Sequence, residues 1–337
     1  MVAAACSSSN DGGTATSDGD AAALAVCLSV EPVSGRSPKL VSTVAPITNL
    51  IALVVGDSGA SVDGLVPEGT NSHTFEPPPS AAAVVEDADV VFVNGLGLED
   101  PSIELAENNA TNAVICELGT AVLPEGEWVY DFSFPREGGK PNPHLWTNPP
   151  MVRQYIDVIR DVLSALDPAN KAVYEANHRE LARVISDLDA AMATATATIP
   201  AANRKLLTYH DAYAYFATHF GYEVVGAIQP SSFEEPSPRE IADLIEQVKS
   251  LGVKAVFGSE VFPSPVLAQI GAETGVRYID VLRDDDLTGE PGDPDHSWAD
   301  LMRFNYVTMV EALGGDPSAL EAVDTDTGVV DKAFYPQ

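Results

Sequence analysis

Short, mainly apolar runs alternate with amphipathic stretches along most of this chain. The runs at 40–44, 61–66, 89–93, 113–116, 205–209, 223–228, 253–257 and 278–282 predict buried β-strands. The stretches between them, where apolar residues recur every three or four positions, predict helices at 46–55, 80–88, 101–108, 149–166, 237–249, 263–274 and 297–313. This alternation is typical of parallel sheets with helices on their faces, so we predict an α/β fold.

One long helix divides the pattern into two halves. It is predicted to follow Asp167-Pro168 and to end before Pro200. Its roughly 30 residues would span about 45 Å, enough to run along two lobes. We therefore expect two lobes, each with a mostly parallel sheet flanked by helices, joined by this helix. The expected division is a signal remnant and flexible tether at 1–37, an N-terminal α/β lobe at 38–168, a linking helix at 169–199 and a C-terminal α/β lobe at 200–337.

The charge balance excludes some classes of partner. With 18 basic and 50 acidic residues, the formal net charge is −32. Such a chain repels nucleic acid and anionic bilayer surfaces, and it attracts cations without selecting among them. No run of about 18 apolar residues predicts a membrane span.

The three cysteines do not have the spacing of a thiolate metal site. Cys6 follows the small residues 2–5 and precedes a polar run, an order similar to a bacterial lipoprotein junction. We expect lipidation there, the alternative being an ordinary N-terminus with an incidental cysteine. Cys116 is expected to be a buried thiol in a strand. The segment 21–30 is apolar but too short to span a membrane, and its pattern does not assign it.

Three histidines are placed alike, each just before a predicted helix. His210 ends an apolar strand and precedes Asp211, a predicted helix cap, while His73 and His144 lie on loops. The carboxyl ends of parallel strands are where open α/β sheets bind ligands, so we expect one shared imidazole site. Asp280, near the end of its strand, is the expected fourth ligand. Three imidazoles and a carboxylate fill a tetrahedral Zn²⁺ shell at about 2.0–2.2 Å.

The remaining polar candidates receive weaker assignments. Glu260, just past a strand, and Asn148, at a helix start, are expected to contact the metal ligands without binding the metal themselves. His178 lies on the apolar stripe of the long helix and is predicted to be packed there. His219 is nine positions after His210 and faces away from it on a helix. His296 follows the acidic run 284–295, which we expect to be a solvated loop, with a weak cation funnel as the alternative.

Several stretches together resemble the substrate-binding lipoproteins of zinc and manganese ABC importers, a family once described as lipoprotein adhesins. The resemblance covers about Lys39 to Leu313 and implies two α/β lobes joined by a rigid helix with the metal between them. It implies the ligands His73, His144, His210 and Asp280. The stretches that carry it are SHTFEPPPS, NGLGLE, PHLWTNP, YHDAYAYFATHFGYE, EPSPREIADLIEQVK, AETGVRYIDVL and MRFNYVTMVEAL.

The same resemblance bears on the choice of metal. The position matching His210 varies in the family: a carboxylate there goes with manganese or iron, and an imidazole more often with zinc. This chain is thus expected to favour zinc. Two departures from the family pattern are Asn148, where an aspartate is usual, and the absence of histidine between His73 and His144, where many zinc members are rich in it. The second departure leaves manganese open.

We therefore expect a monomeric extracytoplasmic binding protein at the bacterial surface or in the periplasm, anchored by lipid at Cys6. It would capture Zn²⁺, or alternatively Mn²⁺ or Fe²⁺, without an organic cofactor and hand it to an ABC importer permease. Release would separate His73 and His144 from His210 and Asp280. We do not expect an enzyme. The alternatives are a zinc hydrolase, against which the absence of HExxH argues, and an adhesin or scaffold with a structural metal.

Overall fold

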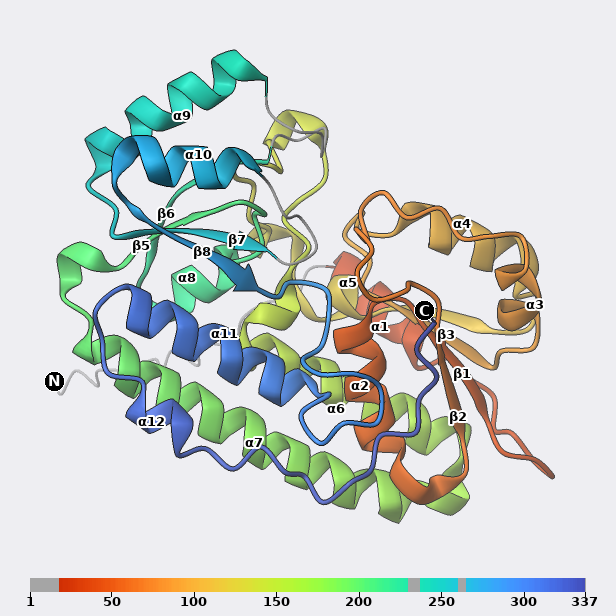
Figure 1. The fold of residues 1–337 in the computed structure, drawn as a ribbon. Coiled ribbons are helices and arrows are strands. Elements are labelled where there is room, and N and C mark those ends of the chain that lie inside the picture. The colour runs from red at the N-terminus through yellow and green to blue at the C-terminus, as the bar shows by residue number, and fades with distance from the viewer. Residues whose placement is uncertain (1–17, 230–236, 260–264, 337) are drawn as a thin grey trace, which may run out of the picture.

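Two parallel four-stranded sheets form the centres of two lobes (Figure 1). The computed structural model describes residues 18–229, 237–259 and 265–336. The N-terminal sheet has the order β2-β1-β3-β4 and the C-terminal sheet the order β6-β5-β7-β8, with every neighbouring pair parallel. The predicted α/β class with two lobes is confirmed. The strands are β1 (Lys39–Ser42), β2 (Ser61–Gly64), β3 (Val90–Val93), β4 (Val114–Glu117), β5 (Lys205–Thr208), β6 (Glu223–Ala227), β7 (Ala255–Ser259) and β8 (Arg277–Leu282).

Helices cover both faces of each sheet. Two of them begin at caps that the sequence supplies: Ser237 accepts the backbone N–H of Glu240 in a capping box, and Ser297 accepts that of Asp300. In Figure 1, α9 and α10 lie on one side of the C-terminal sheet and α8 and α11 on the side toward α7. The helices are α1 (Asp18–Cys27), α2 (Ala45–Val55), α3 (Ala81–Glu86), α4 (Asp100–Asn109), α5 (Leu118–Val122), α6 (Pro149–Leu166), α7 (Lys171–Thr198), α8 (Ala214–Phe220), α9 (Pro238–Leu251), α10 (Pro265–Thr274), α11 (Trp298–Ala312) and α12 (Ser318–Glu321).

The long helix is α7, which runs beneath both lobes (Figure 1). It has 28 residues, which correspond to about 42 Å. Its buried side chains follow the predicted stripe, His178 and Leu188 among them. The large apolar core that includes Leu188 also contains Phe92 of the N-terminal sheet and Phe257 of the C-terminal sheet. Because the two lobes share this core, a wide hinge opening would expose apolar surface to water.

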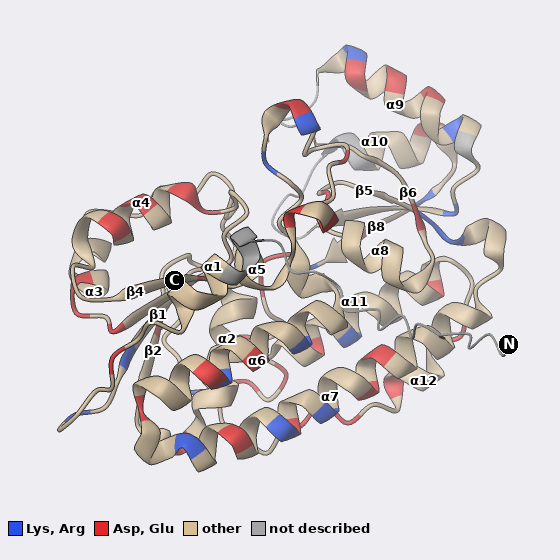
Figure 2. Ribbon diagram, turned by 180° about the vertical axis from the view of Figure 1, so that it is seen from behind, with Lys and Arg blue, Asp and Glu red and all other residues tan. Residues whose placement is uncertain are grey.

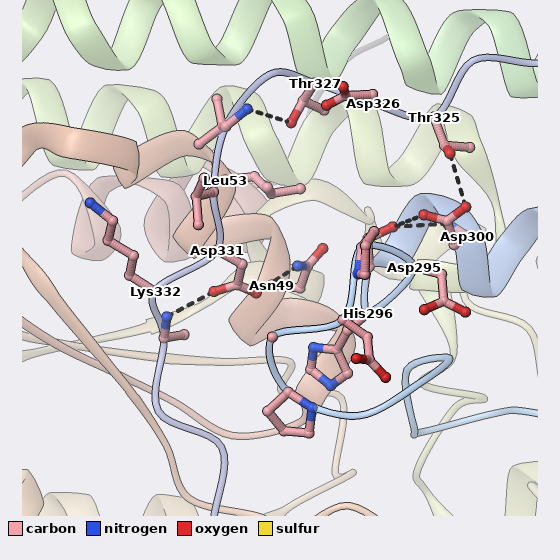
Figure 3. A pocket seen from close by; sticks show the side chains of 18 of the residues that line it. Asn49, Leu53, Asp295, His296, Asp300, Thr325, Asp326, Thr327, Asp331 and Lys332 are labelled. Carbon is pink, nitrogen blue, oxygen red and sulfur yellow. Dashed lines mark hydrogen bonds between the residues drawn. The ribbon is translucent and has the colours of Figure 1, made fainter.

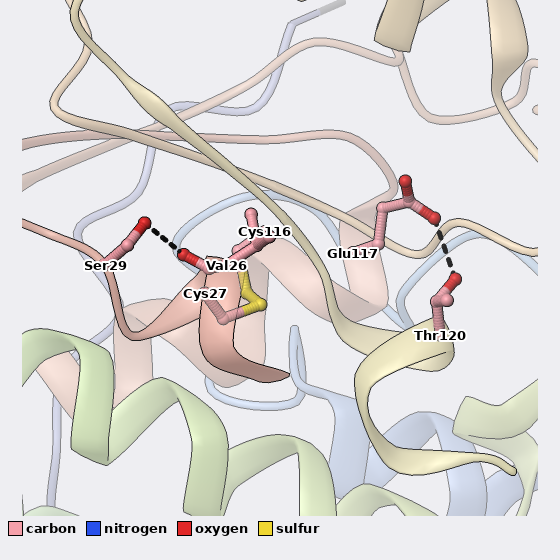
Figure 4. Close-up of a disulfide and its surroundings, with 6 residues drawn as sticks. All are labelled: Val26, Cys27, Ser29, Cys116, Glu117 and Thr120. Carbon is pink, nitrogen blue, oxygen red and sulfur yellow. Dashed lines mark hydrogen bonds between the residues drawn. A yellow bond between two sulfur atoms is a disulfide. The ribbon is translucent and has the colours of Figure 1, made fainter. Parts of the chain in front are cut away.

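The segment before β1 departs from the expected tether. Residues 18–27 form α1, which packs against α5 and β4. Cys27 is fully buried and forms a disulfide with Cys116, with 4.6 Å between the two Cα atoms (Figure 4). The prediction of an unstructured segment up to residue 37 is therefore wrong. Cys116 is buried in strand β4 as predicted, but it is half of a disulfide rather than a free thiol. The two cysteines lie 89 positions apart, so spacing along the chain gives no sign of the pairing.

The C-terminal tail returns to the N-terminal lobe. Phe334 pairs in parallel with β2: its N–H donates to the Val62 carbonyl at 2.9 Å, and its carbonyl accepts from the Gly64 N–H at 2.8 Å. A cavity of about 810 Å³ lies between this tail and the loop before α11 (Figure 3). One of its carboxylates, Asp331, accepts from the Asn49 side-chain amide at 2.8 Å. The last residues of the chain thus belong to the N-terminal lobe rather than to the C-terminal one.

The surface carries both signs of charge along α6 and α7 (Figure 2). Arg153 pairs with Asp157 and Arg183 with Asp187, each at 3.0 Å. Exposed pairs of this kind add little to stability. Among the described residues, no helix is both long and apolar enough to cross a membrane.

Candidate metal centre

Three imidazoles from three different loops converge between the lobes. His73 lies on the loop between β2 and α3, His144 on the loop before α6, and His210 just after β5. Their Nε2 atoms form a small triangle: His73 to His144 is 3.1 Å, His73 to His210 is 3.3 Å, and His144 to His210 is 2.8 Å. Three nitrogens at about 2.0–2.1 Å from one tetrahedral ion would be about 3.3 Å apart, so the triangle has the size of a metal-binding face.

The surroundings favour neutral imidazoles. His144 and His210 are almost completely buried, and His73 is half-buried. Burial, with a smaller contribution from the neighbouring His210, holds the pKa of His73 and the pKa of His144 well below the usual range. A neutral imidazole keeps a lone pair on one nitrogen, which is the form that binds a metal ion.

Side-chain amides orient two of the rings. His144 Nδ1 lies 2.8 Å from Asn142 Oδ1, and His210 Nδ1 lies 2.7 Å from Gln229 Oε1. An amide oxygen only accepts hydrogen bonds, so each Nδ1 carries the proton and each Nε2 keeps its lone pair directed at the triangle. Sequence reasoning missed both amides. Asn142 could have been suspected from its position two residues before His144.

The structure does not bring Asp280 to the histidines. Its side chain is exposed on β8, and among the described residues the group of convergent ligand atoms consists of the three histidines. Asp285, three residues beyond the end of β8, is buried instead. One of its oxygens accepts from the Ser72 hydroxyl at 2.6 Å, and the other, Oδ1, has no hydrogen-bond partner among the described residues.

The carboxyl group of Asp285 interacts electrostatically with His210. Burial raises its pKa, and interaction with His210 acts in the opposite direction, as does the hydrogen bond from Ser72. The same two influences, burial and His210, act on the pKa of Asp284. Two carboxyl groups therefore lie within electrostatic reach of His210. Burying a carboxylate oxygen without a hydrogen-bond donor costs free energy unless a cation or a proton lies next to that oxygen.

The acidic run is partly an internal structure. Asp284, Asp285 and Asp286 are buried, so the expectation of a solvated loop is wrong for them, although residues 290–295 are exposed. Asp286 accepts the Gly69 N–H at 2.7 Å. His296 lies 3.2 Å from the carboxylate of Glu68. Three consecutive acids resemble a surface loop in sequence, but here Asp285 and Asp286 accept hydrogen bonds from Ser72 and Gly69 of the loop that carries His73, and Asp284 accepts from the Tyr213 hydroxyl.

Other predicted positions have mixed outcomes. Asp211 does not cap α8, whose N-cap is Tyr213; its carboxylate accepts the Ser133 N–H at 3.0 Å instead. Asn148 is at the N-cap of α6, but its side chain makes no capping bond, and its Oδ1 is buried without a partner among the described residues. Glu260 and Cys6 lie outside the described residues.

The histidines expected to lie outside the site do so. His178 is buried on α7 and contacts Asp157 of α6 at 2.8 Å. His219 contacts Asp189 of α7 at 2.6 Å. Both predictions, a packed His178 and a His219 that faces away, are confirmed.

The loop that carries His144 is attached to the C-terminal lobe. The Asn142 amide donates to the Asp211 carbonyl at 2.7 Å, and the Thr147 hydroxyl donates to the Ala212 carbonyl at 2.9 Å. His144 and His210 thus belong to one hydrogen-bonded unit. The loop of His73 reaches that unit through Ser72 and Gly69, which donate to Asp285 and Asp286.

Two α/β lobes on a shared long helix form the architecture of a two-lobed solute-binding protein, and the buried imidazoles between them are donors suited to a transition-metal ion. The family model described as zinc-uptake complex component A, periplasmic, matches residues 40–312. The chain belongs to this family.

Curated relatives carry the names of different metals. The manganese-binding lipoprotein MntA of Halalkalibacterium halodurans is 30% identical over 83% of this chain and 89% of its own length. The iron-binding protein YfeA of Yersinia pestis is 28% identical over 82% of this chain and 86% of its own. The high-affinity zinc uptake system protein ZnuA of Bacillus subtilis is 26% identical over 93% and 94%.

Solved structures agree on the fold. The periplasmic zinc binding protein TroA from Treponema pallidum has a TM-score of 0.74 at 21% identity, covering 82% of this chain and 99% of its own. The periplasmic metal binding protein from candidatus Liberibacter asiaticus has a TM-score of 0.71 at 26% identity, covering 82% of this chain and 100% of its own. The first likeness concerns the fold alone.

Proposed function

We propose that this protein captures a divalent transition-metal ion, with Zn²⁺ favoured, between its lobes and delivers it to the permease of an ABC importer. The observation that carries the proposal is the convergence of the Nε2 atoms of His73, His144 and His210 within 3.3 Å of one another. Membership in a family of metal-uptake binding proteins supports the same role.

The fourth ligand in this proposal is Asp285 Oδ1. The carboxylate is held through its other oxygen by Ser72, the neighbour of His73, and Oδ1 is buried without a donor among the described residues. Asp284 is the competing candidate, because its Oδ2 is also without a donor there, while its Oδ1 accepts from the Tyr213 hydroxyl at 3.2 Å. Three imidazoles and one carboxylate suit zinc, and the second carboxylate would help to balance the charge of a divalent ion.

The choice of metal rests on this chain's own donors, since the relatives are named for manganese, iron and zinc. Imidazole suits zinc, whereas a larger share of carboxylate oxygen suits manganese. The test is calorimetric competition between Zn²⁺ and Mn²⁺ on chelator-stripped protein, wild type beside His210→Glu. We expect one tight Zn²⁺ per wild-type chain, weak Mn²⁺ binding, and a gain of Mn²⁺ in the variant. Equal or tighter Mn²⁺ binding by wild type would contradict the preference for zinc.

Release in this proposal begins at the His73 loop. His144 and His210 share one hydrogen-bonded unit. The loop of His73 is attached to it by the contacts of Ser72 and Gly69 with Asp285 and Asp286 and by those of Glu68 with His296 and the Leu287 N–H. Loss of these few bonds would remove one ligand and leave the shared core intact. This order differs from the sequence-based expectation that His144 leaves together with His73.

We further propose that the protein acts outside the cytoplasm as a monomer, tethered to the membrane by a lipid on Cys6, and works with an importer's permease and ATPase. Relatives that carry the name lipoprotein support this location. The test is fractionation of cells that express the full chain. Wild type should be found with the membrane and Cys6→Ser in the soluble fraction, whereas equal distribution of the two would contradict lipid anchoring.

Two other functions make different predictions. A zinc hydrolase needs an open metal position and a general base, so a metal-loaded sample should turn over an ester, peptide or phosphate substrate. A scaffold with a structural metal should unfold when the metal is removed. The carrier proposal predicts no turnover above that of the free metal and an apo protein whose far-UV circular dichroism and cooperative unfolding remain.

A further inference from the structure

The turn after β3 has an unusual backbone. Its sequence, Asn94 to Glu99, is the NGLGLE stretch, to which no role has been assigned above. Leu96 has φ of 56°, the only positive φ at a non-glycine position in the described part of the chain, and it lies between Gly95 and Gly97, which have φ of 77° and 78°. A buried leucine in this conformation is disfavoured and persists only where surrounding interactions enforce it.

A buried carboxylate enforces the turn. Glu99, only 1% exposed, accepts the Asn94 N–H at 2.6 Å, the Gly95 N–H at 3.2 Å and the Thr43 hydroxyl at 2.7 Å. The carboxylate therefore closes the turn upon itself and attaches it to the end of β1. A side chain at Gly95 would meet the Glu117 carboxylate at 2.6 Å and the Thr120 hydroxyl at 2.8 Å, and its φ of 77° also favours glycine.

The closed turn presents the Asn94 side chain to the loop of His144. The Asn94 Nδ2 donates to the Pro143 carbonyl at 2.9 Å, and its Oδ1 accepts from the Tyr155 hydroxyl at 2.6 Å. All these groups are buried. Tyr155 belongs to α6, which follows His144 in the chain, so Asn94 connects the residue before this ligand with the helix after it.

We infer that Asn94 is a positioning residue for the metal ligand His144. Asn94 holds the backbone immediately before His144 from the N-terminal lobe, while Asn142 holds the same loop from the C-terminal lobe through the Asp211 carbonyl. His144 is then held at two points. Its ring Nδ1 is bound to Asn142, and its backbone is held through the preceding residue, Pro143. The strained turn, which Glu99 holds in its conformation, directs this amide at the Pro143 carbonyl.

This inference rests on the proposed metal site, and the experiment separates the two. Chelator-stripped wild type, Asn94→Ala and Tyr155→Phe are titrated with Co²⁺, whose visible absorption reports ligand geometry, and with Zn²⁺. The matched control is Asn203→Ala, which removes a similar amide-to-carbonyl bond, to Leu313 at 3.0 Å, on the far side of the C-terminal lobe from β5's carboxyl end. Tyr155→Phe covers the case in which Asn94→Ala does not fold.

We expect an altered Co²⁺ spectrum and about a tenfold rise in the Zn²⁺ dissociation constant for Asn94→Ala, by analogy with other changes behind metal ligands. A smaller change of the same kind is expected for Tyr155→Phe and none for Asn203→Ala. Unchanged spectra and Zn²⁺ affinity in both folded variants would make Asn94 a purely structural residue. Failure of wild type to bind either ion would overturn the metal site itself and the inference with it.

Discussion

The Nδ1 nitrogen of His210 lies 2.7 Å from the Oε1 oxygen of Gln229. This bond fixes the tautomer of His210, a proposed metal ligand, with a neutral amide rather than with a carboxylate. Gln229 is itself held, because its carbonyl accepts the Ser133 hydroxyl at 2.6 Å. The orientation of His210 therefore depends on a residue that follows β6, the strand next to its own.

The first prediction concerns that amide. Gln229→Leu should weaken metal binding by about 10- to 100-fold, because the His210 ring loses the partner that sets its tautomer and direction. The measurement is Zn²⁺ affinity by competition with a chromogenic chelator. Gln247→Leu is the matched control, since the Gln247 side-chain amide donates to the Val225 carbonyl at 3.1 Å in the same lobe. Equal affinities of wild type and Gln229→Leu would contradict this role.

The second prediction concerns the Cys27–Cys116 disulfide. It closes a loop with a sequence separation of 89, so its loss should lower the free energy of unfolding by about 2–5 kcal/mol. The measurement is urea unfolding of apo protein with and without reductant. The paired variant Cys27→Ser/Cys116→Ser should match reduced wild type and should show no response to reductant. Metal stoichiometry should not change, because the bond lies away from the histidines; a loss of stoichiometry would oppose this view.

The third prediction concerns pH and the buried Glu99. Burial raises the pKa of Glu99 to about 7 from an ordinary 4.5. The folded protein thus holds this proton more tightly than the unfolded chain does. The stability from Glu99 is fully present below about pH 4.5 and is lost as pH rises to about 7, a change of about 3 kcal/mol. Asp286, whose pKa burial also raises to about 7, acts in the same direction.

The measurement is the free energy of unfolding of apo protein at several pH values between 5 and 8. Wild type should lose stability across this range, and Glu99→Gln, which has no proton to release, should lose less. The two proteins are compared by the slope of the unfolding free energy against pH rather than by its absolute value, since the variant also changes hydrogen bonds to the turn. Parallel slopes for the two proteins would show that Glu99 does not titrate in this window.

The sequence was sufficient for the parts of the fold that periodic burial determines. Strands such as β3 are continuous apolar runs, and α7 carries its apolar stripe at helical spacing, so both could be located from local pattern. The three histidines could be placed together because each precedes a helix start, and an α/β fold with two lobes brings such positions from both sheets to the region between the lobes.

The remainder depends on contacts between distant residues. Asp280 is favoured by its place near the end of a strand, yet the chain continues beyond Leu282, and it is Asp285 that accepts a hydrogen bond from Ser72, the neighbour of His73. The pairing of Cys27 with Cys116 and the return of Phe334 to β2 are likewise long-range. A local sequence pattern indicates whether a segment is a helix or a strand. Which distant residues pair with one another is decided only when the whole chain packs.

The most direct test of the account compares three aspartates. Metal stoichiometry and affinity are measured by calorimetry on chelator-stripped wild type, Asp285→Asn, Asp284→Asn and Asp280→Asn. We predict one Zn²⁺ per wild-type chain, a loss of at least tenfold in affinity for Asp285→Asn, a smaller loss for Asp284→Asn, and no change for Asp280→Asn, whose side chain is exposed on β8. Absence of stoichiometric Zn²⁺ binding by wild type, or unchanged affinity in Asp285→Asn with a loss in Asp280→Asn, would contradict the account.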